Sequence, residues 1–167
     1  MRSRHRFQEW RAARLSREDG QSLVEFSLVL VLMLLILSAV IDLGRGYYSY
    51  IAIQNAAGEG ALYAAINPRC PHSDSGPGCA DPNNVDFRAK NETPPGGLID
   101  PARINVAVTY IDGTDDYSPN TVVEGTPVTV TVTYRFHLIG PFSPVFPGGE
   151  LVFTANAVQD ILDLKPE

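Results

Sequence analysis

Residues 26–41 read FSLVLVLMLLILSAVI, sixteen consecutive positions without a charged side chain. Counted outward to residues 23–43, the run has twenty-one residues. As an α-helix such a run is roughly 31 Å long, which matches the hydrocarbon thickness of a bilayer. We therefore predict one membrane span. A cleavable secretory signal is the alternative, but its apolar core is normally shorter and is followed by paired small residues, which the following SAVIDLGRGYY does not contain.

Charged residues are distributed unequally on the two sides of this run. Six of the thirteen Lys and Arg residues precede it, whereas the positions after residue 20 hold seven basic and sixteen acidic side chains. Lys and Arg beside a span stay in the cytoplasm, so we expect the N-terminus inside and the remainder outside. The acidity of the exported part argues against nucleic acid as a partner, because phosphate binding needs a basic surface. The six basic residues are Arg2, Arg4, Arg6, Arg11, Arg14 and Arg17.

A carboxylate, Glu25, stands alone at the inner edge of the run, within EDGQSLVEFSL at residues 18–28. Gly20 and Gln21, followed by Glu25 and Phe26, resemble the processing site of type IV pilins, which a prepilin peptidase cuts directly after the glycine. The aromatic residue after the glutamate is similar to the Tad (tight adherence) branch of that superfamily. The resemblance implies cleavage between Gly20 and Gln21.

The resemblance extends over roughly residues 17–66. The stretch QSLVEFSLVLVLMLLILSAVIDLGRGYYSYIAIQNAAGEGALYAA is similar to the TadE-like pseudopilins, including an Asp-x-Gly-Arg motif, a Gln-Asn-Ala-Ala segment and a later Glu-Gly-Ala. Major pilins of this branch are usually far shorter, so the length places the chain with pseudopilins or unusually large pilins. The residues of these motifs are Asp42, Gly44, Arg45, Gln54 to Ala57, and Glu59 to Ala61.

An ionised carboxylate near a bilayer edge costs a few kcal/mol unless it has a partner. Cleavage after Gly20 would create an α-amine at Gln21, about one helical turn from Glu25. The resemblance implies that Glu25 pairs with the N-terminus of a neighbouring subunit and so sets the register of assembly. The alternative is a glutamate that reaches toward water or is favoured by the helix dipole.

The segment after the span keeps a helical composition as far as residue 66. Tyrosines at its start are typical of a membrane surface, and Asp42 and Arg45 are spaced for an ion pair on the helix surface. Small residues then recur every four positions, which lets another backbone approach closely. We expect this stripe to pack inside the chain, and a second copy's helix is the alternative. The stripe consists of Ala52, Ala56, Gly60 and Ala64.

Residues 67–101 contain seven prolines and four glycines, which predicts a long irregular loop without helix or central strand. The loop holds both cysteines of the chain, Cys70 and Cys79. In an exported segment such a pair is expected to form a disulfide. Zinc bound by these cysteines and His72 is the alternative, but a fourth ligand at suitable spacing is missing.

Three segments beyond the loop show the alternation of strands. Residues 103–110 and 128–136 place apolar side chains at every second position, and 151–157 does so more weakly. One apolar face per strand indicates an antiparallel sheet with one buried side, and the small-residue stripe is available to cover it. We therefore predict an α+β fold in which a long apolar helix, first a span and then a stalk, packs on a small antiparallel sheet in a pilin-like layout.

Two connections between the strands stand out. The first, residues 111–126, carries Asp112, Asp115 and Asp116, which could bind calcium, although solvated turn acids are commoner and the spacing differs from an EF-hand. The second, residues 138–149, reads LIGPFSPVFPGG and is apolar for a connection. We expect it to cap the core, with presentation of Phe142 and Phe146 to a neighbour or to the bilayer surface as the alternative.

The predicted organisation is a basic cytoplasmic leader at 1–20, a span and stalk helix at 21–66, a cysteine-bearing loop at 67–102 and a β head at 103–167. We expect a TadE-like pseudopilin or minor pilin of the bacterial inner membrane that acts in a Tad or type IV-like pilus. The implied partners are prepilin peptidase, other pilin subunits in homo- or hetero-oligomers, the assembly platform and membrane lipid. Whether the protein enters the extracellular pilus stays open.

The alternative function is an unprocessed membrane protein that displays a small adhesive or binding domain. We expect neither catalysis nor a cofactor, because no motif marks a nucleophile with its base and no glycine-rich phosphate loop follows a strand. Retention of the first twenty residues in the mature chain would favour this alternative.

Overall fold

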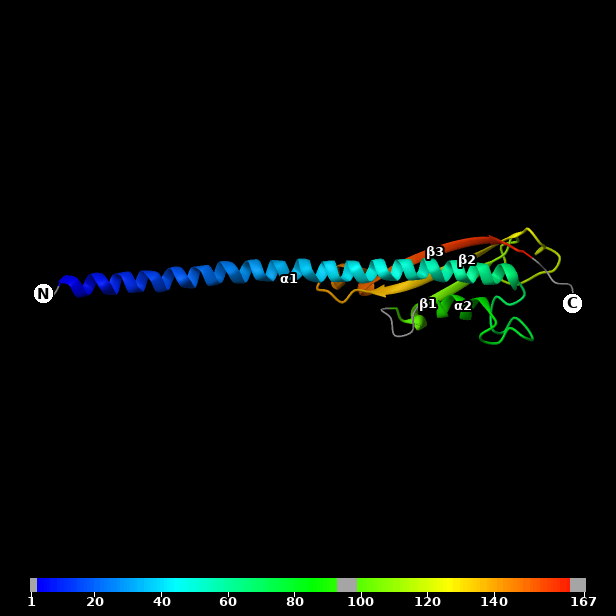
Figure 1. The fold of residues 1–167 in the computed structure, drawn as a ribbon, viewed down its shortest axis with the longest axis horizontal. Helices are drawn as coiled ribbons and strands as arrows, with labels where there is room; N and C mark the ends of the chain where they lie inside the picture. The colour runs from blue at the N-terminus through cyan, green and yellow to red at the C-terminus, as the bar shows by residue number, and fades with distance from the viewer. Residues whose placement is uncertain (1–2, 93–98, 163–167) are drawn as a thin grey trace. The chain divides into compact units, whose positions relative to one another are not determined.

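The computed structural model describes residues 3–92 and 99–162, with side chains from residue 20 onward. Its main elements are the helices α1 (Ser3–Ile66) and α2 (Val85–Asn91) and the strands β1 (Ile104–Thr109), β2 (Pro127–His137) and β3 (Glu150–Asp160) (Figure 1). Short 3₁₀ turns occupy Pro101–Arg103, Ser143–Val145 and Pro147–Gly149. The chain divides into two compact units, residues 1–41 and 42–167, and each is described separately below.

The described part of the first unit is a helical segment whose large apolar side chains are exposed. From residue 20 to residue 41 nearly every position is exposed, including Leu28 at 68% and Met33 at 63%. A window of 18 residues in this part of α1 has a mean hydropathy of 2.8 and none of it is buried. By length and composition, α1 is therefore able to cross a membrane, and a bilayer would remove this apolar surface from water.

The second unit contains a sheet with the strand order β1-β2-β3, in which both neighbouring pairs are antiparallel. Along the central strand β2, burial alternates strictly, so that one face lies in the core and the other carries three partly exposed threonines. Strand β3 buries less, with Ala155 in the core and Phe153 packed at its margin. The predicted α+β fold with a small antiparallel sheet is confirmed. The core side chains of β2 are Val128, Val130, Val132, Tyr134 and Phe136.

The second half of α1 contributes the small side chains that complete this core. Ile53, Ala56, Ala57, Ala61 and Ala64 are each fully buried. Because alanine adds little bulk, the helix backbone lies close to the sheet and to α2. The core therefore lies between the second half of α1 and one face of the sheet.

The irregular loop predicted for residues 67–101 is corrected at one place, because α2 lies within it. The backbone N–H of Phe87 donates to the Asn84 side-chain oxygen at 2.7 Å, which caps the first turn. The stretch between Pro82 and residue 94 lacks proline, so a two-turn helix fits there. Val85 and Ala89 are fully buried, and packing of this face stabilises a helix too short to persist alone.

Candidate functional site

The residues that resemble a processing site lie on the exposed part of α1. The side-chain amide of Gln21 donates to Oε1 of Glu25 at 3.1 Å, one helical turn away. Phe26 is 63% exposed, and Gly20, Gln21 and Glu25 are exposed as well. The local hydrogen bond therefore holds the carboxylate beside the residue that would carry the new α-amine.

Packing does not explain a glycine at position 20. Among the described residues, no atom beyond the local helix backbone lies within 4 Å of the position that a Cβ would take at Gly20. Glycine inside a helix costs about 0.5–1 kcal/mol relative to alanine. Gly20 therefore carries a local cost to the helix with no compensating contact in the structure described.

Asp42 is a buried carboxylate of the second unit with three hydrogen-bond partners. It is 7% exposed, and its carboxylate accepts hydrogen bonds from the backbone N–H groups of Gly140 at 2.7 Å and Ile139 at 3.3 Å. The Arg45 guanidinium also donates to Oδ1 of Asp42 at 3.1 Å. The ion pair predicted from the spacing is therefore present, but the pair lies at a tertiary contact and not on an open helix surface.

Arg45 connects the carboxylate to an aromatic cluster. Its guanidinium carbon lies 5.2 Å from the centroid of the Phe136 ring, and Phe136 stacks on Phe153 with centroids 5.6 Å apart. Tyr50 meets Phe153 edge-on at 6.4 Å. A cation over an aromatic face adds about 0.5–2 kcal/mol. The beginning of the second half of α1 is thereby fixed to β2, to β3 and to the connection between them.

The stripe of small residues lies inside the chain. Ala52 is 8% exposed, Ala56 and Ala64 are fully buried, and Gly60 is buried as well. A Cβ at Gly60 would lie 3.1 Å from Cγ1 of Val130 and 3.2 Å from Cβ of Ala89. This face of the helix is therefore occupied by β2 and α2 and is not open to a second copy.

Cys70 and Cys79 form a disulfide, with their Cα atoms 5.1 Å apart. The bonded sulfurs are not available as thiolate zinc ligands, and Nδ1 of His72 lies 3.0 Å from Oδ2 of Asp86. Over the described part of the chain, no group of three or more His, Cys, Asp or Glu side chains could hold a metal ion. His72 thus joins the cysteine loop to α2.

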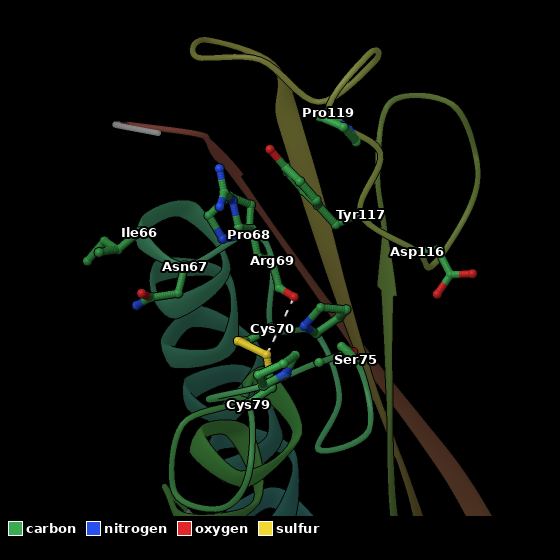
Figure 2. Close-up of a pocket in the computed structure, with 13 residues that line it drawn as sticks. Ile66, Asn67, Pro68, Arg69, Cys70, Ser75, Cys79, Asp116, Tyr117 and Pro119 are labelled. Atoms are coloured by element: carbon green, nitrogen blue, oxygen red, sulfur yellow. Dashed lines mark hydrogen bonds between the residues drawn. A yellow bond between two sulfur atoms is a disulfide. The ribbon is translucent and has the colours of Figure 1, made fainter. Parts of the chain in front are cut away.

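Figure 2 shows an open hollow of about 960 Å³ beside this disulfide. It is lined by the end of α1, by the cysteine loop and by residues 116, 117 and 119 of the β1–β2 connection. The Arg69 guanidinium lies 5.7 Å from the Tyr117 ring centroid, and the Cys79 sulfur lies 3.6 Å from the Arg69 carbonyl oxygen. The lining of this hollow mixes polar and apolar groups.

Two groups beside this hollow have shifted pKa values. Burial, with the nearby Tyr117 and the acids Asp112 and Asp116, raises the pKa of Tyr110 well above its usual range, and its hydroxyl donates to the Pro68 carbonyl oxygen. Hydrogen bonds from Thr121 and Thr114 lower the pKa of Asp112. Both hydroxyls donate to Asp112 at 2.7 Å, so this carboxylate serves to order the β1–β2 connection.

The apolar β2–β3 connection, residues 138–149, differs from the expected cap. Leu138 enters the core at 8% exposure, but Phe142 and Phe146 remain 42% and 37% exposed. Neither phenylalanine belongs to the core cluster or packs against it among the described residues. Only Leu138 of this connection therefore contributes to the core as expected of a cap, whereas the two phenylalanines are exposed, which fits the alternative in which they are presented outward.

Sequence reasoning missed two contacts that join distant segments. Residue 42 meets residues 139 and 140, and Tyr110 meets Pro68. The one signal for the first was a carboxylate at the edge of the apolar run, where a charge requires a partner. The second left no signal in the sequence.

The comparison with known protein families gives a match within α1. Residues 20–62 match the family model described as TadE-like protein, which covers 43 of the 167 residues. The resemblance to TadE-like proteins is confirmed over this segment, which begins at Gly20 and ends in the buried small-residue part of α1. No curated protein and no solved structure matches the chain.

Proposed function

Taking the TadE-like segment at residues 20–62 as the premise, we propose that the chain is a pseudopilin or minor pilin of a Tad pilus. In this proposal a prepilin peptidase cuts after Gly20, and the mature chain begins at Gln21. The apolar helix holds the protein in the bacterial inner membrane until the chain is assembled. The family is in general not one of enzymes, and the function proposed is structural.

The observation that carries the proposal is Gly20 itself. The family match begins at this residue, while no contact of the described chain requires a glycine there. Gly44 and Gly58 of the same helix also lack such contacts, so it is the position of Gly20, five residues before Glu25, that recognition outside the folded chain would explain. A peptidase that needs a small residue before the cut bond supplies this explanation.

Glu25 and the apolar surface after it support a role in assembly. The large side chains of residues 23–41 are exposed, so they are free to contact lipid and later the helices of neighbouring subunits. In such a dry bundle a carboxylate needs a partner, and the α-amine of a neighbouring Gln21 would supply the charge. Glu25 then fixes the axial register, because any other register leaves it unpaired.

The cysteine pair supports export of the head. Disulfides persist in oxidising compartments and are rare in the cytosol, and Cys70 and Cys79 are bonded. An excess of basic residues before the span supports the same orientation, with residues 1–20 inside and the head outside. Partners in this proposal are the peptidase, other pilus subunits and the assembly platform.

The hollow beside the disulfide favours one second candidate. Its volume of about 960 Å³ is within the range of ligand pockets, so an unprocessed membrane protein that displays a binding head is the alternative function. This alternative leaves Gly20 without an explanation.

The decisive experiment determines the N-terminus of the mature protein. Its intact mass is measured on protein from native membranes and on protein from sheared surface material. We expect the chain to begin at Gln21 and the Gly20→Ala variant to keep its leader. Gly44→Ala is the matched control, because Gly44 lies in the same helix and also lacks neighbours within 4 Å. An uncleaved wild-type chain would overturn the proposal in favour of the binding-head alternative.

A further inference from the structure

We propose that the β2–β3 connection, residues 138–149, is a second lipid contact, which lies on the bilayer surface where the membrane span ends. The inference rests on the proposed anchoring of the helix in a membrane. It is independent of peptidase cleavage and of the side of the membrane on which the head lies.

The connection has the side chains of a membrane-facing surface. None of its twelve residues is charged. Its exposed apolar side chains are those of Ile139 at 72%, Phe142 at 42%, Val145 at 75% and Phe146 at 37%. Contiguous exposed apolar residues on a soluble surface mark a site of interaction with protein or membrane.

Asp42 binds this connection at the point in the chain where the apolar run ends. The apolar run ends at residue 43, and the Asp42 carboxylate binds the backbone N–H groups of Gly140 at 2.7 Å and Ile139 at 3.3 Å. The polar headgroup layer adds about 5–8 Å to each side of the hydrocarbon core. Because Asp42 follows directly on residue 41 in the chain, a connection bonded to Asp42 would lie near the headgroup layer once the apolar segment is in a bilayer.

The backbone of the connection is hydrogen-bonded within itself although most of its side chains are exposed. Leu138 N donates to Gly149 O at 3.0 Å, Val145 N to Phe142 O at 3.0 Å, and Gly149 N to Phe146 O at 2.9 Å. Satisfied backbone groups lower the cost of entering an apolar layer, and a preformed shape lowers the entropic cost of binding. The exposed phenylalanines are thus held ready for contact.

The adjoining turn of α1 favours lipid over a second protein. Leu43, the last residue of the apolar run, is 74% exposed, and Tyr47, one turn further, is 65% exposed. Tyrosine is enriched where a protein crosses the surface of a bilayer. The Asp42 hydrogen bonds therefore join the connection to the turn of α1 that the proposed anchoring places at the bilayer surface.

The test uses the full chain in vesicles of phosphatidylethanolamine and phosphatidylglycerol. A polarity-sensitive fluorophore is attached at Val145→Cys and, as the matched control, at Val123→Cys. Val123 is 48% exposed and lies beyond the opposite end of β2, and both native cysteines are bonded to each other. We expect a blue shift and quenching by headgroup-linked quenchers at position 145, and water-like emission at position 123.

A third label distinguishes failure of this inference from failure of the anchoring. Val31 lies in the span and is 58% exposed in the structure, so a label at Val31→Cys must be shielded if the helix enters the bilayer. Shielding at 31 without shielding at 145 overturns the lipid contact alone. Water-like emission at 31 overturns the anchoring and this inference with it.

Two further outcomes complete the test. If the label at 145 is shielded only at high protein density and is not reached by lipid-linked quenchers, its partner is another protein and the proposal is wrong. We also expect Asp42→Ala to abolish shielding at 145 while shielding at 31 is retained, and Asp42→Asn, which keeps an acceptor oxygen, to preserve part of it. Full shielding in Asp42→Ala would overturn Asp42 as the positioning residue.

Discussion

The two halves of α1 have the same secondary structure but opposite surfaces. Between residues 20 and 41 the side chains are large, apolar and exposed, as with Leu32 at 58%. Between residues 42 and 66 one face carries alanine and glycine, and Ala56 and Ala61 are fully buried. The difference teaches that side-chain size, more than hydrophobicity, distinguishes the exposed apolar half of this helix from the face that packs against a folded neighbour.

The physical reason lies in what fills the space around the helix. Lipid chains are fluid and adapt to any side chain, so long residues cost nothing and maximise apolar contact. A sheet is rigid, and a helix approaches it closely only where side chains are small. Four experiments test this contrast, taken from the largest expected effect to the smallest.

The strongest test of the contrast is a large side chain in the buried stripe. We expect Gly60→Leu to lower the free energy of unfolding of the head by about 3 kcal/mol or more, because overpacking forces the core apart. The nearest obstacles would be Val130 and Ala89, at 3.1 and 3.2 Å from the new Cβ. Urea unfolding of the full chain in detergent, followed by the circular dichroism of the sheet, measures the change.

Gly58→Leu is the matched control for this substitution. It lies half a turn away, and among the described residues nothing lies within 4 Å of the position of its Cβ. We expect the control to leave the head as stable as before, or more stable by up to about 1 kcal/mol through helix propensity. Equal losses in the two variants would contradict a buried stripe.

Removing the disulfide should affect the second unit alone. We expect the double variant Cys70→Ser and Cys79→Ser to lose about 2–3 kcal/mol of unfolding free energy, because its unfolded chain is no longer constrained. The bond joins residues nine positions apart in the chain. Reducing agent should shift the unfolding of the wild type by the same amount and leave the variant unchanged; a variant that still responds would refute this assignment.

A smaller effect is expected at the buried tyrosine of the head. Tyr110→Phe removes the hydrogen bond to the Pro68 carbonyl, which costs about 1 kcal/mol at neutral pH. Burial raises the pKa of Tyr110, so the folded state disfavours its ionisation. The wild type should therefore keep full stability below the unfolded-state pKa of about 10 and lose it as the pH rises further.

The phenylalanine variant lacks this ionisation and should show a flatter stability curve in alkali. Urea midpoints measured at a series of pH values compare the two proteins. Curves of the same slope would show that Tyr110 titrates alike in the folded and unfolded states, contrary to its buried position.

The smallest effect on stability is expected for a substitution in the exposed first half of α1. Ala39 is exposed in the first half of α1. Ala39→Leu should leave the stability of the head unchanged and keep the protein in the membrane fraction, since lipid adapts to the added bulk. A loss of stability near that of Gly60→Leu would mean that this half of the helix also packs against the folded head.

The sequence was sufficient for features encoded within a few residues. Each of three features is visible as a local pattern along the chain. These are the uncharged run, the four-residue spacing of small side chains, and the alternation of valine with threonine in β2. Gly20 and Glu25 were also visible, because a processing motif is read along the chain. The family match at residues 20–62 tests this resemblance, whereas cleavage itself stays a prediction.

Features that depend on distant contacts could not be predicted. Nothing near Asp42 in the sequence indicates that its partners are 97 and 98 residues away. The helix α2 was missed because the density of proline around it outweighed a short favourable stretch after Asn84. The connection at residues 138–149 was expected to cap the core because apolar character alone does not distinguish a buried side chain from an exposed one.

The hydrogen bonds of Asp42 also have a consequence for the order in which the chain folds during synthesis. Asp42, near the end of the apolar run, is synthesised early. The two backbone N–H groups that donate to its carboxylate follow 97 and 98 residues later. Until then the carboxylate must stay hydrated, and the central strand β2 lacks its partner β3. The head therefore completes its fold only after nearly the whole chain has been synthesised, so a truncated chain would retain the anchor but lack a finished head.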